Sequence, residues 1–250
     1  MSDGKSFMNV LFVVTARGGS KGVPNKNITD LAGLPLLAYK IISAQRTKCD
    51  KRIILSTDSE AIAEVGRKYG AETPFVRPAV LATDTSLSAD VVLHAMDWVE
   101  RKGSRFDCVF VLEPTSPFGT YKDFEAALKL MESPHIDNVV GVRETEPNSI
   151  FITPLEEDGS LKGLASKLAS TRNLNRQNFK KEYTPNGTLY VSRWDAFKQQ
   201  NTEHKKWFYT ERTYTVIQER YYSIEIDSKD DLMLARFAAE QGLVDLSYWK

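Results

Sequence analysis

The sequence feature that most limits the fold is an unbroken apolar run near the N-terminus. Residues Met8 to Thr15 (MNVLFVVT) are apolar or β-branched almost throughout. A strand with one solvated face alternates polar and apolar residues, so a continuous run predicts a strand that is covered on both faces. A glycine-rich loop follows, and the apolar residues from Leu34 to Gln45 then recur at helical spacing. The chain therefore opens with a strand, a loop and a helix.

The same succession repeats along the first 142 residues. Further strands are predicted at 52–56, 107–112 and 138–142, and further helices at 60–69, 88–101 and 123–131. We expect Asp58 to cap the second helix and Gly70 to end it. This alternation predicts an α/β fold with a mostly parallel open sheet and helices on both faces. Ligands bind such sheets at the carboxyl ends of the strands, so the loops 16–27, 57–59 and 113–118 should converge on one site.

The pattern weakens between Arg143 and Pro185, where apolar residues are few and out of period. We interpret 143–185 as an inserted excursion from a single domain that spans 1–250, because long loops in compact proteins are uncommon unless they serve a function or an interface. Strands at 187–192, 214–217 and 222–226 and a helix at 229–241 follow.

Composition removes several classes of function. The chain has 33 basic and 33 acidic residues, so it lacks the net positive charge that binding to nucleic acid favours. Its two cysteines, Cys49 and Cys108, and its three histidines are not spaced as metal ligands or redox pairs. No apolar run has the length of a membrane span or of a signal peptide core. We expect a cytoplasmic protein that binds neither nucleic acid nor a membrane.

The loop behind the first strand has the composition of a phosphate site. The sequence ARGGSKGVPNKN (16–27) places Arg17, Lys21 and Lys26 among three glycines. Glycines let the backbone turn tightly and present N–H groups to an anion, and the cations supply charge. The loop matches neither a Walker A motif nor the Rossmann glycine fingerprint. It predicts a site for a polyanion such as a triphosphate, and a solvated basic turn is the alternative.

The loop also resembles the signature of the acylneuraminate cytidylyltransferases, the CMP-sialic acid synthetases. The resemblance covers nearly the whole chain in order: it continues through STD (56–58), RPAVLATDTS (77–86), PTSPF (114–118), NRQ (175–177), PNGTLYV (185–191) and SIEID (223–227). It implies a Rossmann-like nucleotidyltransferase fold. It also implies that Arg17, Lys21, Lys26 and Asn27 bind the phosphates of CTP, and that Arg77 and Ser86 hold the cytidine.

A carboxylate pair near the C-terminus is the candidate metal site. Alternate residues of a strand face the same side, so a strand through SIEID would present Glu225 and Asp227 together. Mg²⁺ is commonly bound by one or two carboxylates and substrate phosphates. The family usually carries two aspartates here, so Glu225 is a departure and Asp227 the firmer ligand.

The resemblance also implies a sugar site. Arg176 is the candidate for the sugar carboxylate, and Gln177 and Asn186 are candidates for its hydroxyls, with a turn as the other role of Asn186. The family commonly has glutamine where this chain has Glu113, which favours a sugar with an amine or additional hydroxyls; pairing of Glu113 with a neighbouring arginine is the alternative. Trp207 and Phe208 are expected either to wall this pocket or to pack in the core or a dimer interface.

The function implied is transfer of CMP from CTP to the anomeric hydroxyl of a nonulosonic, sialic-acid-like sugar, with release of pyrophosphate. Arg17, Lys26 and Asp227 would be catalytic, with Mg²⁺ as cofactor, in lipopolysaccharide or capsule synthesis. Activation of an octulosonic acid or its amino derivative, and a non-catalytic CTP-binding domain, are the alternatives. The excursion is expected to make a homodimer and to complete the partner's sugar site.

Overall fold

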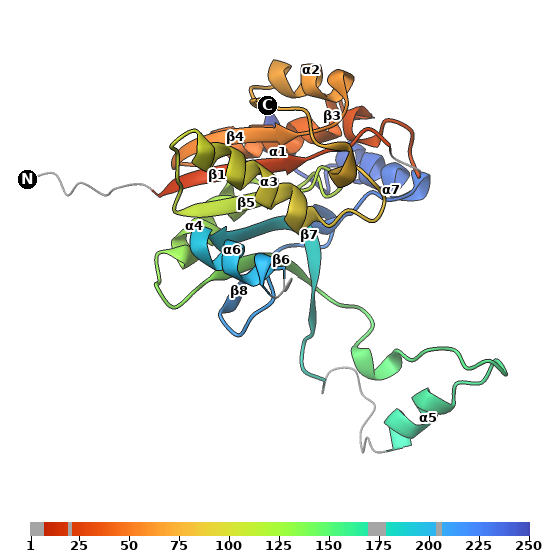
Figure 1. Cartoon of the computed structure of the whole chain (residues 1–250). Coiled ribbons are helices and arrows are strands. Elements are labelled where there is room, and N and C mark those ends of the chain that lie inside the picture. The colour runs from red at the N-terminus through yellow and green to blue at the C-terminus, as the bar shows by residue number, and fades with distance from the viewer. Residues whose placement is uncertain (1–7, 20–21, 170–178, 204–206) are drawn as a thin grey trace, which may run out of the picture.

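A six-stranded sheet forms the centre of the computed structural model, which describes residues 8–19, 22–169, 179–203 and 207–250 (Figure 1). Its strands are β1 (Asn9–Thr15), β4 (Asp50–Ser56), β5 (Cys108–Leu112), β6 (Asn138–Glu144), β7 (Tyr183–Arg193) and β8 (Thr213–Ile217). They lie in the order β4-β1-β5-β7-β6-β8. β7 pairs antiparallel with β5 and β6, whereas the pairs β1–β4, β1–β5 and β6–β8 are parallel. The predicted mostly parallel α/β sheet is confirmed.

Helices cover both faces of this sheet. In the described residues the helices are α1 (Leu36–Arg46), α2 (Glu60–Lys68), α3 (Ser88–Arg101), α4 (Tyr121–Met131), α5 (Lys162–Ala169), α6 (Trp194–Thr202) and α7 (Lys229–Glu240). Of these, α5 lies away from the sheet on a projecting segment (Figure 1). The predicted α3 has the observed bounds, whereas α6 was not predicted. In the described part of the chain, no helix combines the length and the apolar content needed to cross a bilayer.

Alternate residues of the central strands build two separate cores. Phe12 and Phe110 pack on one face with residues of α1 and α4, while Val13 and Val111 pack on the other with residues of α3 and α6. Burial on both faces explains why β1 and β5 are continuous apolar runs. Cys108 is buried in β5 and unpaired, as its place in such a run predicts.

A third apolar cluster joins the C-terminal segment to the outer side of α1. Tyr39 and Leu36 of α1 contact a group that includes Ile224, Ile226 and Trp249. The indole of Trp249 donates to the hydroxyl of Ser43 at 2.8 Å. Because α7 and the C-terminus pack against α1, the segment that precedes α7 is held beside the N-terminal loop.

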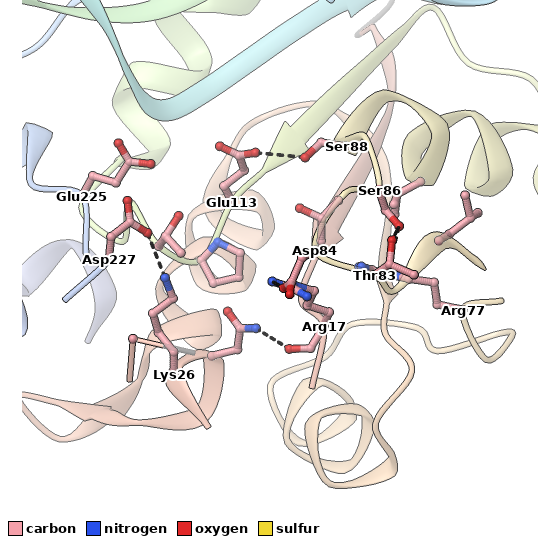
Figure 2. A pocket seen from close by; sticks show the side chains of 17 residues that line it. Arg17, Lys26, Arg77, Thr83, Asp84, Ser86, Ser88, Glu113, Glu225 and Asp227 are labelled. Carbon is pink, nitrogen blue, oxygen red and sulfur yellow. Dashed lines mark hydrogen bonds and ion pairs between the residues drawn. The ribbon is translucent and has the colours of Figure 1, made fainter. Parts of the chain in front are cut away.

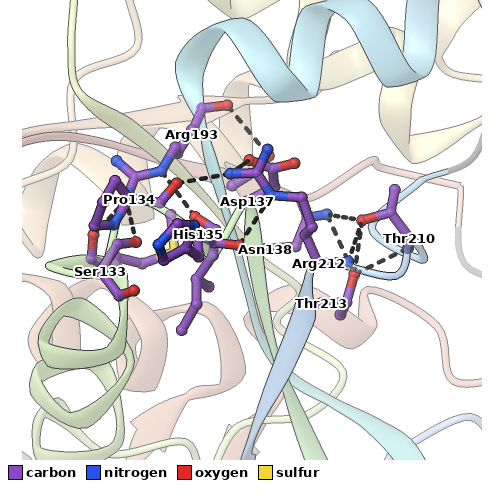
Figure 3. A network of polar contacts seen from close by, with 12 residues as sticks. Ser133, Pro134, His135, Asp137, Asn138, Arg193, Thr210, Arg212 and Thr213 are labelled. Carbon is purple, nitrogen blue, oxygen red and sulfur yellow. Dashed lines mark hydrogen bonds and ion pairs between the residues drawn. The ribbon is translucent and has the colours of Figure 1, made fainter.

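Two arginines fasten the edge of the sheet where β6 begins and β7 ends (Figure 3). Arg193 donates to the carbonyl oxygens of Met131, Ser133 and Ile136 at 2.6 to 2.8 Å, just beyond α4. Arg212 donates to the carbonyls of Pro134 and His135. Guanidinium N–H groups donate to backbone oxygens at the end of a helix, so the polar groups at this end of the strands serve the structure and not a ligand. The carboxyl ends of the parallel strands lie at the opposite end of the sheet.

The chain leaves the sheet between β6 and β7 and projects from the body of the protein (Figure 1). Both strands are longer than predicted, because Arg143 and Glu144 pair with Thr184 and Tyr183 at the base of the excursion. The projecting part holds a short 3-10 turn at Ser149–Phe151 and helix α5.

Two local predictions were wrong. No strand forms at 222–226: a 3-10 helix spans Tyr221–Ser223, and the N–H of Ile226 reaches the carbonyl of Thr115 instead of a neighbouring strand. Asp58 does not cap α2, whose N-cap is Ser59 without a side-chain hydrogen bond. The carboxylate of Asp58 instead accepts from the N–H of Gly18 at 2.8 Å, because the two loops meet at the strand ends.

Lys40 of α1 is fully buried behind the carboxyl ends of the parallel strands. The ammonium group of Lys40 donates to the carbonyl of Thr188 and has no exposed surface. Burial lowers the pKa of Lys40 to about 7, against the opposing effect of the carboxylates of Asp123 and Glu113. A buried ammonium group without an ion-pair partner is costly, so this residue should make folding depend on pH.

We predict that Lys40→Met is stabilised relative to wild type at pH 7 and that the difference shrinks by pH 9.5. The pKa of Lys40 is about 7 in the folded state and 10.5 when exposed, so the unfolded state binds more protons between these values. The contribution of Lys40 to the free energy of unfolding of the wild type therefore rises with pH between these two pKa values. Urea unfolding at the two pH values measures it, with the exposed Lys68→Met as control. A difference independent of pH would contradict the prediction.

Candidate functional site

A polar cleft of about 400 Å³ lies at the carboxyl ends of β1 and β5 (Figure 2). Its lining comes from four segments that are distant in sequence: 15–27, 77–91, 113–115 and 225–227. Most of the predicted site residues meet here: Arg17, Lys26, Asn27, Arg77, Ser86, Glu113, Glu225 and Asp227. Lys21, Arg176 and Gln177 lie outside the described residues. The predicted convergence of the strand-end loops is confirmed for the loops after β1 and β5.

The glycine-rich loop approaches the segment before α7 very closely. A Cβ atom on Gly22 would lie 2.1 Å from the carbonyl oxygen of Asp227, closer than any side chain permits. Glycine is therefore required at this position for packing. The contact brings Asp227 beside the loop that carries the cations.

Lys26 links the same two segments through its side chain. Its ammonium group donates to the carbonyl of Ile226 at 2.8 Å and to a carboxylate oxygen of Asp227 at 3.0 Å. The side chain is only 13% exposed, so its ammonium group is held by these two oxygens and has little contact with water. An ammonium group held in this way faces the cleft beside a carboxylate, where it can bind a phosphate oxygen.

Arg17 forms the second cationic point of the cleft. Its guanidinium pairs with Asp84 at 2.6 Å, and its carbonyl accepts from the buried amide of Asn27 at 2.9 Å. Asn27 thus orients the backbone of Arg17 instead of offering its amide to a ligand. Asp84 holds the guanidinium where a phosphate would bind, so the two anions would compete for it.

Arg77 is 5% exposed and lies at the end of β4. Its side chain donates to the carbonyl of Ser56 at 2.5 Å and to the Ser56 hydroxyl at 3.2 Å. Burial lowers the pKa of Arg77 to about 10, and the group stays charged at neutral pH. The hydroxyl of Ser86 is engaged by Thr83 and by the carbonyl of Val80, so it shapes the adjoining loop.

Glu113 follows directly on β5 and lies in the middle of the cleft (Figure 2). One of its oxygens accepts from the hydroxyl of Ser88 at 3.4 Å. Its pKa is raised to about 7, first by burial and then by the negative charge of Glu225, while Lys40 acts in the opposite direction. The group can therefore hold or release a proton near neutral pH.

Glu225 and Asp227 both face the cleft, although they do not lie in a strand as predicted. The intervening Ile226 and the preceding Ile224 are buried in the third apolar cluster, which turns both acids outward. The pKa of Glu225 is raised by burial and by Asp227. No group of three or more His, Cys, Asp or Glu side chains in the described residues is placed to hold a metal. Two carboxylates without further protein ligands suit Mg²⁺ that binds together with nucleotide phosphates.

Asn186 lies outside the cleft, unlike the other described residues predicted to bind substrate. Its amide donates to Gln218 and Ser223 at 2.9 Å and accepts from Thr188, and it is 3% exposed. With both ends of the amide engaged, it orders the start of β7. Phe208 is fully buried and packs on Tyr190 and Phe197, so it belongs to the core.

Asp84 and Ser88 line the cleft and were not identified from the sequence. Both lie in or beside the segment 77–86, in which only Arg77 and Ser86 were singled out. A carboxylate two residues before Ser86, in a segment expected to hold the cytidine, was the signal that could have identified Asp84.

We predict that Asp84→Asn tightens binding of inorganic tripolyphosphate about twofold to fivefold. The variant removes an anion that pairs with Arg17, and a half-exposed pair of this kind is worth up to about 1 kcal/mol. Calorimetry measures the affinity. Asp195→Asn on α6, which breaks an exposed ion pair with Arg105, is the matched control and should change nothing. Weaker binding in Asp84→Asn would contradict the competition.

Two relatives align with most of this chain. Post-translational flagellin modification protein B of Campylobacter coli is 31% identical over 233 residues, 93% of this chain and 95% of that protein. CMP-N,N'-diacetyllegionaminic acid synthase of Legionella pneumophila is 34% identical over 230 residues, 91% of this chain and 94% of that protein.

A solved structure is similar to this chain in fold, and a family model is similar to it in sequence. The structure of CMP:2-keto-3-deoxy-manno-octonic acid synthetase complexed with CTP superposes with a TM-score of 0.67 at 15% identity, covering 94% of this chain and 99% of that one. The likeness establishes a common fold. The sequence model of the cytidylyltransferases matches residues 11–232. With the cleft and its cations in place at the strand ends, the chain belongs to the cytidylyltransferase family.

Proposed function

We propose that this protein transfers CMP from CTP to the anomeric hydroxyl of a nonulosonic acid and releases pyrophosphate. The observation that carries the proposal is the cleft in which Arg17 and Lys26 face Glu225 and Asp227 at the strand ends. Two cations beside two acids suit a metal-bound triphosphate. The acceptor class is supported by the relative from Legionella pneumophila, whose name states a CMP-sugar product.

In this proposal the nucleotide spans the cleft. Arg77 reads the cytosine, because its guanidinium is held by Ser56 and has further N–H donors for base oxygens. Ser86 lies beside the ribose end. Arg17 and Lys26 bind the phosphates and neutralise the charge that develops at the α-phosphate. Lys21 remains a predicted phosphate ligand.

Glu225 and Asp227 would hold Mg²⁺ together with phosphate oxygens. The ion supplies positive charge that screens the triphosphate and favours departure of pyrophosphate. Lys26 binds Asp227 at 3.0 Å and would release it or share it when the nucleotide is bound. Glu225 has a longer side chain than the aspartate usual in the family, so Asp227 is the better supported metal ligand.

The sugar would lie beyond the α-phosphate, near Glu113. A carboxylate in this position favours an acceptor with an amine or additional hydroxyls over plain N-acetylneuraminic acid. Arg176 and Gln177 remain the predicted ligands of the sugar carboxylate and hydroxyls. An octulosonic acid or its amino derivative is the second candidate, because an octonic acid synthetase shares the fold.

Pyrophosphate release across nucleotides and acceptors tests this function. CTP should be used in preference to ATP, GTP and UTP. The acceptors are N-acetylneuraminic acid, N,N'-diacetyllegionaminic acid and 2-keto-3-deoxy-manno-octonic acid, each with Mg²⁺ present. Turnover of only the octonic acid would favour the second candidate. CTP binding without pyrophosphate from any acceptor would support a non-catalytic domain.

We predict that Lys26→Met lowers kcat about 100-fold or more, because one charge at the transferred phosphate is lost in a site where charges are held rigidly. Pyrophosphate release measures it, and circular dichroism checks the fold. Lys68→Met, on an exposed face of α2, is the matched control. Wild-type kcat in Lys26→Met would remove the loop from the mechanism.

We further propose a homodimer that uses the excursion. Leu155 and Leu161 are 69% and 51% exposed on the projecting segment, and Ile152 is 53% exposed. Apolar side chains on a projecting arm lower their free energy when a second copy covers them. The excursion would then reach the partner's sugar site.

Light scattering tests the assembly. Wild type should have the mass of a dimer, and the double variant Leu155→Glu, Leu161→Glu should be monomeric, because charges would be buried at the interface. Met233→Glu with Phe237→Glu changes an equally exposed pair on α7 and should leave the dimer intact. A monomeric wild type with full activity would contradict the assembly.

The cellular setting follows from the substrate. We propose that the protein acts in the cytoplasm, where CTP is available, and that its product feeds synthesis of a surface lipopolysaccharide or capsule. Fractionation of cells and loss of the acidic sugar from the surface of a deletion strain test both points.

A further inference from the structure

The carboxyl group of Glu113 lies between the phosphate-binding cations and the start of β7. Ser88 of α3 contacts one carboxylate oxygen. The other oxygen points at Gly187, where a Cβ atom would come within 3.7 Å of it and within 2.4 Å of the Ser116 hydroxyl. The backbone at Gly187 has a φ of 70°, in the region that favours glycine. Ser116 fills the space that a side chain at Gly187 would need, so the backbone of β7 comes close to Glu113.

Charged and titratable groups surround Glu113 without pairing with it. The positive charge of Lys40 on α1 lowers the pKa of Glu113, and the negative charges of Glu225 and Asp227 raise it. The charge of Glu113 in turn raises the pKa of Tyr190 on β7. Tyr209 is affected by the carboxylate in the same way. Within the described ranges no cation forms an ion pair with Glu113, and Glu225 and Asp227 do not form hydrogen bonds with it. Its carboxylate is therefore available to a ligand.

The other polar groups of the cleft are unsuited to accept a proton. Arg17, Lys26 and Arg77 are cations, and Asp84 is paired with Arg17. Glu225 and Asp227 would hold the metal in the proposed function. The described lining contains no histidine. Glu113 is less exposed than these two acids, and a carboxylate removed from water is a stronger base.

We propose that Glu113 accepts the proton of the attacking anomeric hydroxyl. The hydroxyl oxygen forms a bond to the α-phosphorus of CTP, the bond from that phosphorus to pyrophosphate breaks, and the hydroxyl proton moves to a Glu113 carboxylate oxygen. The proton later returns to solvent. This inference rests on the proposed function and assigns its general base.

The test compares Glu113→Gln, Glu113→Asp and Ser88→Ala with wild type in pyrophosphate release from pH 5.5 to 9. The acceptor is whichever of N,N'-diacetyllegionaminic acid and N-acetylneuraminic acid the wild type turns over. Wild-type kcat should rise with pH as the carboxyl loses its proton and then level off. Glu113→Gln should lower kcat about 100-fold or more and lose the rising limb, because an amide cannot take up the proton.

The other variants separate proton transfer from simple binding. Glu113→Asp should keep the rising limb at reduced kcat, and Ser88→Ala should move the rising limb to higher pH, because the hydrogen bond from Ser88 lowers the pKa of Glu113. The Kd of CTP, measured by calorimetry, should be unchanged in all three, which also shows that the nucleotide site is folded.

Two results would overturn the assignment. If Glu113→Gln raises only the KM of the sugar and keeps the rising limb, Glu113 binds the acceptor without taking its proton. If wild type binds CTP but releases no pyrophosphate with either acid, the proposed acceptor class fails and the base assignment fails with it. The first result leaves the proposed function intact, so the two failures are distinct.

Discussion

The ammonium group of Lys26 holds together two parts of the chain that are 200 residues apart, and the cleft depends on this contact. It binds the carbonyl of Ile226 and the carboxylate of Asp227. Gly22 makes the approach possible, since any side chain there would collide with the backbone of Asp227. The buried face of α7 and the C-terminal aromatic residues pack on α1 and bring the acids into place. Cations from the first loop and acids from the last segment thus meet at one edge of the sheet.

A buried polar layer supports the same edge from behind. Asn186, Thr188, Gln218 and Ser223 are linked by hydrogen bonds where β7 enters the sheet. Gly141 of β6 is required for this layer, because a Cβ there would lie 2.4 Å from the hydroxyl of Thr188. Lys40 joins the layer at the Thr188 carbonyl. Buried polar groups that are linked in this way restrict one another's positions, and here they fix the position of Gly187 beside Glu113.

The sequence predicted the sheet well because its central strands are buried on both faces and read as continuous apolar runs. Edges and connections were harder to predict. The segment 222–226 alternates apolar and polar residues as a strand does, but it has only the carbonyl of Thr115 to pair with. The helix α6 follows a strand without a turn signal and was missed. Periodicity reports which face is buried, but it does not report whether a pairing partner exists.

The candidate site was predicted to a similar degree. Residues with charged groups in glycine-rich loops, such as Arg17 and Lys26, lie where expected, because strand ends converge in an open sheet. Asn186 lies outside the cleft, and its sequence position does not reveal that three neighbouring residues bind its amide. Asp84 was missed although it lies two residues before Ser86, because its partner Arg17 belongs to a loop that is distant in the sequence.

Calorimetry that compares CTP with cytidine tests most directly the claim that placed cations grip a polyphosphate. The account predicts that CTP binds wild type at least about tenfold more tightly than cytidine, because charge-assisted hydrogen bonds from Arg17 and Lys26 add to base recognition. In Arg17→Met this advantage should shrink, while cytidine binding stays unchanged. Equal affinities of wild type for CTP and cytidine would contradict the account.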